Sequence, residues 1–190
     1  MIVKTWDAFF PDVLPMLVGT GVPDPTIVHQ LRRAAQTFCT KTRAWKVVLD
    51  STLTTDGTTV YDLELERNVE LVRLESATLN GQPYAVWRAG DDACGRFVST
   101  QDGKTIEISQ GVGPNLPLVL TCSVKPGNAA TGIDDAIFDS YAEVIALGAV
   151  ARLTDNPAKR IDFENQIDVI KTRLWRGNAA IRPRARPSFF

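Results

Sequence analysis

Cysteine and histidine are both scarce in this chain, and the two shortages limit its chemistry. Three cysteines, Cys39, Cys94 and Cys122, lie far apart and form no CxxC pair. An odd, scattered set argues against a disulfide scaffold and favours a reducing compartment. Because His29 is the sole histidine, no tetrahedral ligand set can be assembled. We therefore predict no metal site and no cofactor.

An excess of positive charge is also missing. The 190 residues contain 21 lysines and arginines against 22 aspartates and glutamates, a net charge of −1. Proteins that hold nucleic acid through its phosphates usually carry a clear basic excess. The balance therefore disfavours a general DNA- or RNA-binding domain.

Long apolar runs are lacking as well. Near the N-terminus, Pro11, Asp12 and Pro15 interrupt residues 9–18, so we expect neither a signal peptide nor a membrane span. We expect a chain made in a cytosol, with no membrane partner. A hydrophobic fraction of 44% and a charged fraction of 23% are typical of a globular protein and exclude disorder of the whole chain.

Helical patterns occur at both ends of the sequence. Asp24-Pro25 suits a helix start, and the apolar spacing that follows predicts a helix over about 25–42. Asp134 and Asp135 begin a second helical pattern, in which residues 144–151 are apolar on every side of the expected helix. Asn156-Pro157 begins a last helix, which we expect to stop at Gly177-Asn178.

The middle of the chain has strand patterns. Asp56-Gly57, Asn80-Gly81 and Asp102-Gly103 are hairpin turn pairs. Several short strands joined by such turns predict an antiparallel sheet or a small sandwich. The strand-like runs cover 69–79, 84–88, 96–99, 104–109 and 116–124.

These patterns predict an α+β fold, a helical bundle built from the N- and C-terminal helices with an inserted antiparallel β region and an extended C-terminal arm. The expected segments are an N-terminal part with the first bundle helix (1–44), the inserted β region (45–127), the closing helices (128–178) and the arm (179–190).

No set of residues predicts catalysis. His29 lacks a nucleophile and an orienting carboxylate at a suggestive spacing, so we interpret it as a surface residue. Asp62, Glu64 and Glu66 alternate along a strand, which places them on one face, most simply a solvated one. We therefore predict a protein that is not an enzyme and has no catalytic residue.

The strongest functional signal is the arm. Its prolines favour an extended chain, its arginines offer donor forks to a partner, and its apolar residues are unfavourable in water. A loose terminus is the alternative interpretation, and three arginines neutralise too few phosphates for a stable grip on nucleic acid. The predicted docking residues are Ile181, Arg182, Pro183, Arg184, Arg186, Phe189 and Phe190.

One stretch resembles a known family. The run Leu31-Arg32-Arg33-Ala34-Ala35-Gln36-Thr37-Phe38-Cys39, continued by Thr42-Arg43-Ala44-Trp45 and a strand, resembles the N-terminal helix of head–tail adaptor (connector, neck) proteins of tailed bacteriophages. The layout of helix, β insertion, two closing helices and polar arm is similar too.

This resemblance implies a ring, commonly of twelve copies, beneath the portal protein in the virion neck, made in the host bacterial cytoplasm. It implies that the arm docks on the portal, that the helices contact neighbouring copies, and that β loops meet a tail or nozzle protein. Double-stranded DNA would pass through the ring without tight binding, which a near-neutral charge suits.

Three alternatives remain. A tail-completion or baseplate component would differ in stoichiometry and in its position in the virion. A small ligand-binding or enzymatic domain would need a concave pocket with convergent polar groups. A host regulator that binds DNA through its arm would show steeply salt-dependent binding of duplex DNA.

Overall fold

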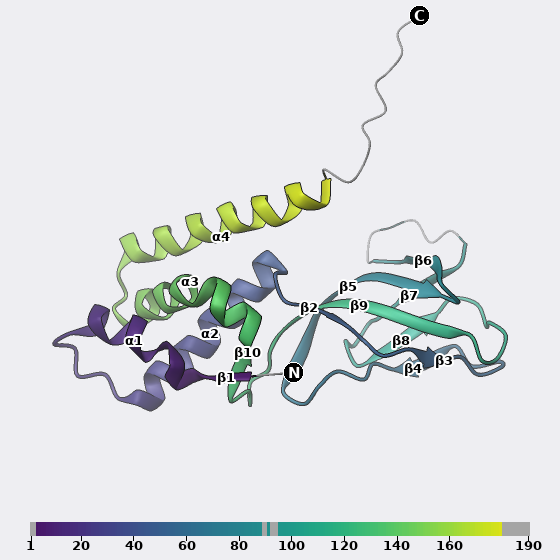
Figure 1. The fold of residues 1–190 in the computed structure, drawn as a ribbon, viewed down its shortest axis with the longest axis horizontal. Coiled ribbons are helices and arrows are strands. Elements are labelled where there is room, and N and C mark those ends of the chain that lie inside the picture. Colours follow the sequence, from purple (N-terminus) through teal and green to yellow (C-terminus); the bar gives the residue numbers. More distant parts are fainter. Residues whose placement is uncertain (1–2, 89–90, 92–94, 180–190) are drawn as a thin grey trace, which may run out of the picture.

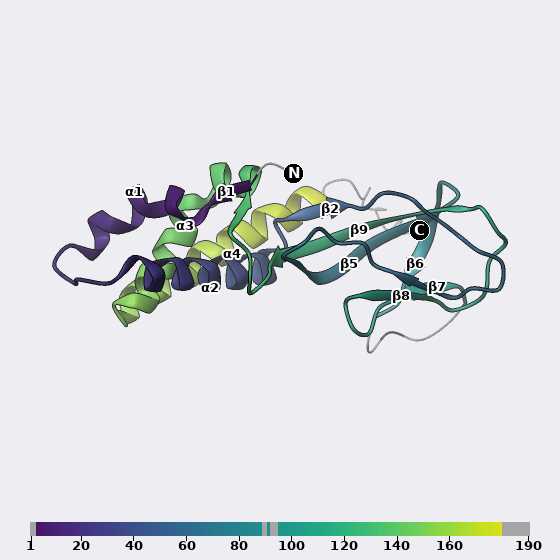
Figure 2. The same cartoon turned by 90° about the horizontal axis from the view of Figure 1, so that it is seen from below.

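A computed structural model describes residues 3–88, 91 and 95–179. The molecule is elongated, with the helices gathered at one end and most strands at the other (Figures 1 and 2). Short 3₁₀ helices η1 (Trp6–Phe9) and η2 (Leu14–Leu17) flank α1 before the first long helix. The α-helices are α1 (Phe10–Val13), α2 (Asp24–Thr42), α3 (Asp135–Leu153) and α4 (Pro157–Ala179).

Helix α2 confirms the first predicted helix. Its buried face consists of the apolar residues whose spacing predicted it, together with Cys39 and Thr42. The helix ends at Thr42, and the next residue, Arg43, adopts a left-handed conformation with φ 54° and donates its backbone N–H to the carbonyl of Cys39. Glycine is the usual residue in that conformation at a helix end.

The two closing helices also lie where they were predicted. The Asp134 side chain accepts a hydrogen bond from the backbone N–H of Ala136, and Asn156 caps α4 in the same way through Ala158. The predicted stop at Gly177-Asn178 is wrong, because α4 continues to Ala179. A single glycine costs a helix only about 1 kcal/mol, so it does not by itself end one.

Gly148 allows α3 and α4 to approach closely. A Cβ atom at this position would lie 2.6 Å from ring atoms of Phe163 on α4, and that ring is buried. Alanine normally stabilises a helix by about 1 kcal/mol relative to glycine, whereas overpacking costs about 1–3 kcal/mol. We expect Gly148→Ala to lower the free energy of unfolding by up to about 2 kcal/mol, the overpacking cost less the gain from alanine, measured by urea denaturation. Gly111→Ala, where a Cβ meets nothing within 4 Å, is the control; equal stability of the two variants would contradict the prediction.

The strands form one large sheet and one small one. The large sheet has eight strands in the order β2-β9-β5-β6-β7-β8-β4, and β3 also pairs with β9. Neighbouring strands within this sheet are antiparallel, except for β6 and β7, which are parallel. The small sheet pairs β1 (Val3–Thr5) with β10 (Gly132–Asp134) beside the helices. The large sheet contains β2 (Lys46–Val48), β3 (Thr52–Leu53), β4 (Val60–Asp62), β5 (Val69–Leu79), β6 (Gln82–Val86), β7 (Phe97–Ser99), β8 (Thr105–Ile108) and β9 (Pro117–Pro126).

The expected fold class, a helical bundle with a small inserted antiparallel sheet, is therefore wrong. The fold is mixed α/β, with four α-helices in the described part of the chain and a curled eight-stranded sheet. The reason is the length of β5 and β9, which pair along most of their 11 and 10 residues. Strand β6 then joins β5 on one side and β7 on the other, so that the hairpins merge into one curved surface (Figure 1).

Both ends of the molecule share one hydrophobic core. Buried side chains of α2, α3 and α4 are continuous with those of β9, β5 and β8. Trp6 closes the core near the small sheet, where its indole N–H donates to the Ala130 carbonyl at 2.8 Å. The helices and the large sheet consequently form a continuous packed unit.

Candidate functional site

The residues that carry the family resemblance lie in the second half of α2 and in the segment that leads from it into β2. Most are packing residues, because Leu31, Ala34, Ala35, Phe38 and Cys39 are fully buried. The exceptions are polar connectors. Arg32 donates to the carbonyl of Asn128 at 2.6 Å, which ties α2 to the turn after β9. Thr42 is buried and accepts the N–H of Ala44 at 3.2 Å, and the carbonyl of buried Trp45 accepts from Val124 at 2.9 Å.

Arg43 makes the most consequential of these contacts. Its guanidinium lies 3.3 Å from a carboxylate oxygen of Glu75 on β5, and both side chains are only 19% exposed. The same carboxylate accepts a hydrogen bond from the buried Ser123 hydroxyl on β9 at 2.6 Å. The guanidinium also lies over the ring of Trp175 on α4, 4.5 Å from its centroid. We call these four residues the joint; they connect the end of α2, the sheet and α4.

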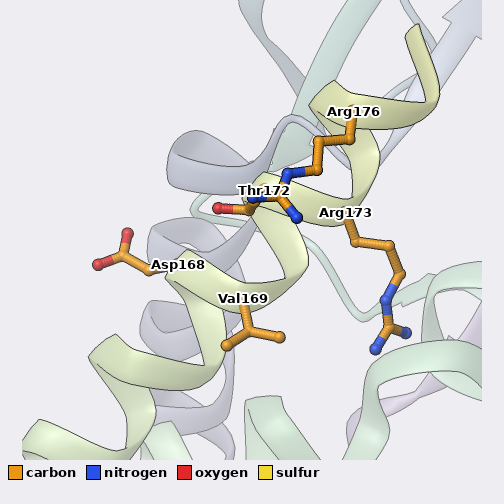
Figure 3. Close-up of a pocket in the computed structure, with 5 residues that line it drawn as sticks. All are labelled: Asp168, Val169, Thr172, Arg173 and Arg176. Carbon is orange, nitrogen blue, oxygen red and sulfur yellow. The ribbon is translucent and has the colours of Figure 1, made fainter. Parts of the chain in front are cut away.

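The exposed side of α4 is a second candidate surface. A cavity of about 580 Å³ runs along it, lined by α4 residues among those the structure describes (Figure 3). Val169 is exposed here, and Figure 3 shows Asp168 and Arg173 pointing to opposite sides of the helix. The helix is described as far as Ala179, and the predicted docking residues at 181–190 lie outside the described residues. The lining residues are Asp168, Val169, Thr172, Arg173 and Arg176.

A third candidate lies where the start of α2, the end of α3 and the start of α4 converge. We call it the arginine groove, a cavity of about 540 Å³. Burial lowers the pKa of Arg152, and the positive charges of Arg33 and Arg160 lower it further. Three guanidiniums therefore share one region of positive potential. The groove is lined by His29, Gln30, Arg33, Gly148, Ala151, Arg152, Asp155, Arg160, Phe163 and Glu164.

Within the described part of the chain, neither cysteine is an activated nucleophile and no group of side chains is arranged to bind a metal ion. Burial raises the pKa of the Cys39 thiol to about 12, and burial together with Glu75 raises that of Cys122 to about 11. Both remain protonated at neutral pH, so neither is an activated nucleophile. His29 is exposed beside the arginine groove, whose described lining includes no serine, threonine or cysteine for it to activate. No three His, Cys, Asp or Glu side chains among the described residues cluster as metal ligands.

The predicted acidic strand face is correct for Asp62 only, because β4 ends at this residue and Glu64 and Glu66 follow it outside any strand. Asp62, Glu64 and Glu66 are exposed and alternate with buried Tyr61 and Leu63. None of the described helices is long and apolar enough to cross a bilayer.

Sequence reasoning missed the arginine groove and the joint. Arg33, Arg152 and Arg160 belong to three helices, so their spacing along the chain carries no signal of their proximity. Only the family resemblance pointed to Arg43. Glu75 is one carboxylate within a strand, and no motif distinguishes it from the others. Arg73 was missed too; its pKa is lowered by burial and then by Arg88 and Arg43.

No protein-family model matches this chain, and a search of curated proteins finds no match.

Proposed function

We propose that this chain is a structural head–tail adaptor of a tailed phage, which assembles as a ring beneath the portal, links capsid to tail and has no enzymatic activity. In this role the arm docks on the portal, the other side receives a tail or nozzle protein, and DNA passes through the channel. A tail-completion or baseplate component is the related alternative. Ring stoichiometry and position in the virion distinguish the two.

The observation that carries the proposal is the anchoring of α4, the helix that leads into the arm. Arg43, a residue of the family-like motif, stacks on Trp175 one turn before the end of the described helix. Lys171 lies on the same ring, 4.9 Å from its centroid. These contacts give every copy the same starting point for its arm, which helps a ring to present many arms to one partner at once.

The charge distribution supports the same role. The chain as a whole carries a net charge of −1, whereas residues 179–190 contain three arginines and no acid. A partner can therefore be recognised through bidentate arginine contacts at the arm. The rest of the molecule adds no net attraction for phosphate, which suits a channel through which DNA must slide.

Deleting the arm tests the proposal. We expect a chain ending at Ala179 to lose at least about 100-fold in affinity for the purified cognate portal ring, because each copy loses its contact and the losses multiply around the ring. Binding can be measured by surface plasmon resonance on immobilised portal, with thermal unfolding checked in parallel. A full-length variant with Arg182, Arg184 and Arg186 changed to Glu should show a similar loss.

The matched control is Arg67→Glu, an exposed arginine in the turn before β5. This variant should bind the portal like the unmodified chain. If the truncated chain binds the portal as tightly as the full chain, arm docking is wrong.

A further inference from the structure

The arginine groove carries more positive charge than its surroundings neutralise. Among the described residues, Arg33 and Arg160 form no ion pair, and Arg152 donates only to the neutral hydroxyl of Thr37, at 2.9 Å. Of the two carboxylates in the groove, that of Glu164 is already bound by Lys41. Glu164 still attracts Arg152, and among the described lining residues Asp155 is the one carboxylate outside an ion pair, beside three guanidiniums.

An excess of negative charge lies on the outer face of β4 and β8. Val60 pairs with Glu107 and Asp62 with Thr105 across these strands, so Val60, Asp62 and Glu107 share one face. Glu64 continues the alternation beyond β4 and is exposed. None of these three carboxylates pairs with a cation in the described part of the chain. We call Asp62, Glu64 and Glu107, with exposed Val60 among them, the acidic face.

The two surfaces lie at opposite ends of the molecule. The groove is formed at the end of the helical part that lies farthest from the large sheet, and β4 and β8 lie in that sheet (Figures 1 and 2). The acidic face of a chain therefore cannot reach the groove of the same chain. Contact between them requires two copies.

We propose that the arginine groove of one copy binds the acidic face of the next, as the contact that repeats between neighbours. This inference rests on the proposed ring and identifies the surfaces that build it. A contact between two different patches of the same chain is heterologous, and such contacts close into rings when the rotation between copies permits. Arginine forks bind carboxylates in bidentate geometry, which fixes orientation as well as affinity.

The dimensions of the groove favour a protein surface over a small anion. Its volume of about 540 Å³ is many times the roughly 30 Å³ that one water molecule occupies in the liquid, and a phosphate is only a few times larger than water. Apolar Ala151 and Phe163 form part of the lining. A second copy offers carboxylates to the guanidiniums, with Val60, 53% exposed, beside them.

A charge exchange between two variants tests the contact. R33E/R160E reverses the groove, and D62K/E64K reverses the acidic face; all four positions are exposed. We expect each variant alone to self-associate at least about 100-fold more weakly than the unmodified chain in sedimentation velocity, because like charges then face each other. An equimolar mixture should recover association, since every contact in an alternating assembly is again between opposite charges.

Recovery in the mixture separates a lost contact from a lost fold, because two misfolded chains do not rescue each other. The matched controls, K46E/R88E and D50K/E143K, change exposed charges outside the surfaces named above and should associate like the unmodified chain. Three results would overturn the inference: an unmodified chain that stays monomeric at about 1 mM, unchanged association of R33E/R160E, or a mixture that stays dissociated. The inference would also fail if R33E/R160E lost affinity for inorganic phosphate or duplex DNA while still self-associating.

The portal-binding experiment fails or succeeds separately. If the full chain fails to bind the portal while the charge exchange behaves as expected, the adaptor role is wrong and the contact between copies stands. If the arm is needed for portal binding but the charge variants associate normally, the contact is wrong and the adaptor role stands.

Discussion

Replacing Phe38 by alanine is expected to lower the free energy of unfolding by about 3–5 kcal/mol. Phe38 is 0% exposed in α2, and its ring centroid lies 5.0 Å from that of Tyr141 on α3. Truncation removes the transfer free energy of a benzyl group and leaves a cavity between the helices. Since domains are stable by about 5–15 kcal/mol, the variant should fold but unfold at a much lower urea concentration.

The control for this prediction is Ile161→Ala on α4. Ile161 is a large aliphatic residue, but it is 60% exposed, so its truncation should change stability by less than about 0.5 kcal/mol. Urea denaturation followed by far-ultraviolet circular dichroism measures both variants. A Phe38→Ala chain as stable as Ile161→Ala would contradict the packing of α2 against α3.

The buried face of α2 shows what the sequence could predict. A helix in contact with a core needs apolar residues at spacings of three and four, and Ile27, Leu31 and Phe38 have that spacing. Local signals also located the starts of α3 and α4, because a cap acts on backbone groups two or three residues away. Predictions of this kind depend on neighbours in sequence, and they were confirmed.

The curled sheet shows where prediction failed. Pairing of β5 with β9 joins residues about fifty positions apart, and β5 changes register twice along it, between Leu71 and Arg73 and between Leu74 and Ser76. Strand runs and turn pairs identify hairpins, but they contain no information on which hairpins join edge to edge. The parallel pairing of β6 with β7 was equally unpredictable from local patterns.

The candidate sites show the same contrast between features set by local sequence, which could be predicted, and features set by tertiary packing, which could not. Alternation predicted that Asp62, Glu64 and Glu66 are solvated, and all three are exposed, although β4 ends at Asp62. The arginine groove depends on how three helices pack, and Arg33 by itself has the pattern of an ordinary exposed helical residue. Its unbalanced charge becomes visible only when Arg152 and Arg160 are placed beside it.

Replacing Glu75 by alanine should have the second largest effect, a loss of about 2–3 kcal/mol of unfolding free energy. The carboxylate is the shared partner of Arg43 and of the buried Ser123 hydroxyl. Its removal leaves a hydroxyl donor without its acceptor and a largely buried guanidinium without its counter-charge. The remaining 19% exposure of Arg43 lets water solvate part of that charge, which keeps the loss below that of a fully buried pair.

Glu70→Ala is the matched control, because Glu70 lies on the same strand and forms an ion pair of the same 3.3 Å length with Lys125. That pair is more exposed, so its loss should cost less than about 0.5 kcal/mol. Loss of Glu75 should also disturb the stack of Arg43 on Trp175, which is measurable as a change in the tryptophan fluorescence that a Trp175→Phe background removes. If Glu75→Ala and Glu70→Ala are equally stable, Glu75 is an ordinary surface partner and the anchoring of α4 depends on Phe163, Ile167 and Ile170, the buried residues of that helix. If Glu75→Ala is less stable and its tryptophan signal changes, the end of α4 is held by the motif residue of α2, as a fixed starting point for the arm requires.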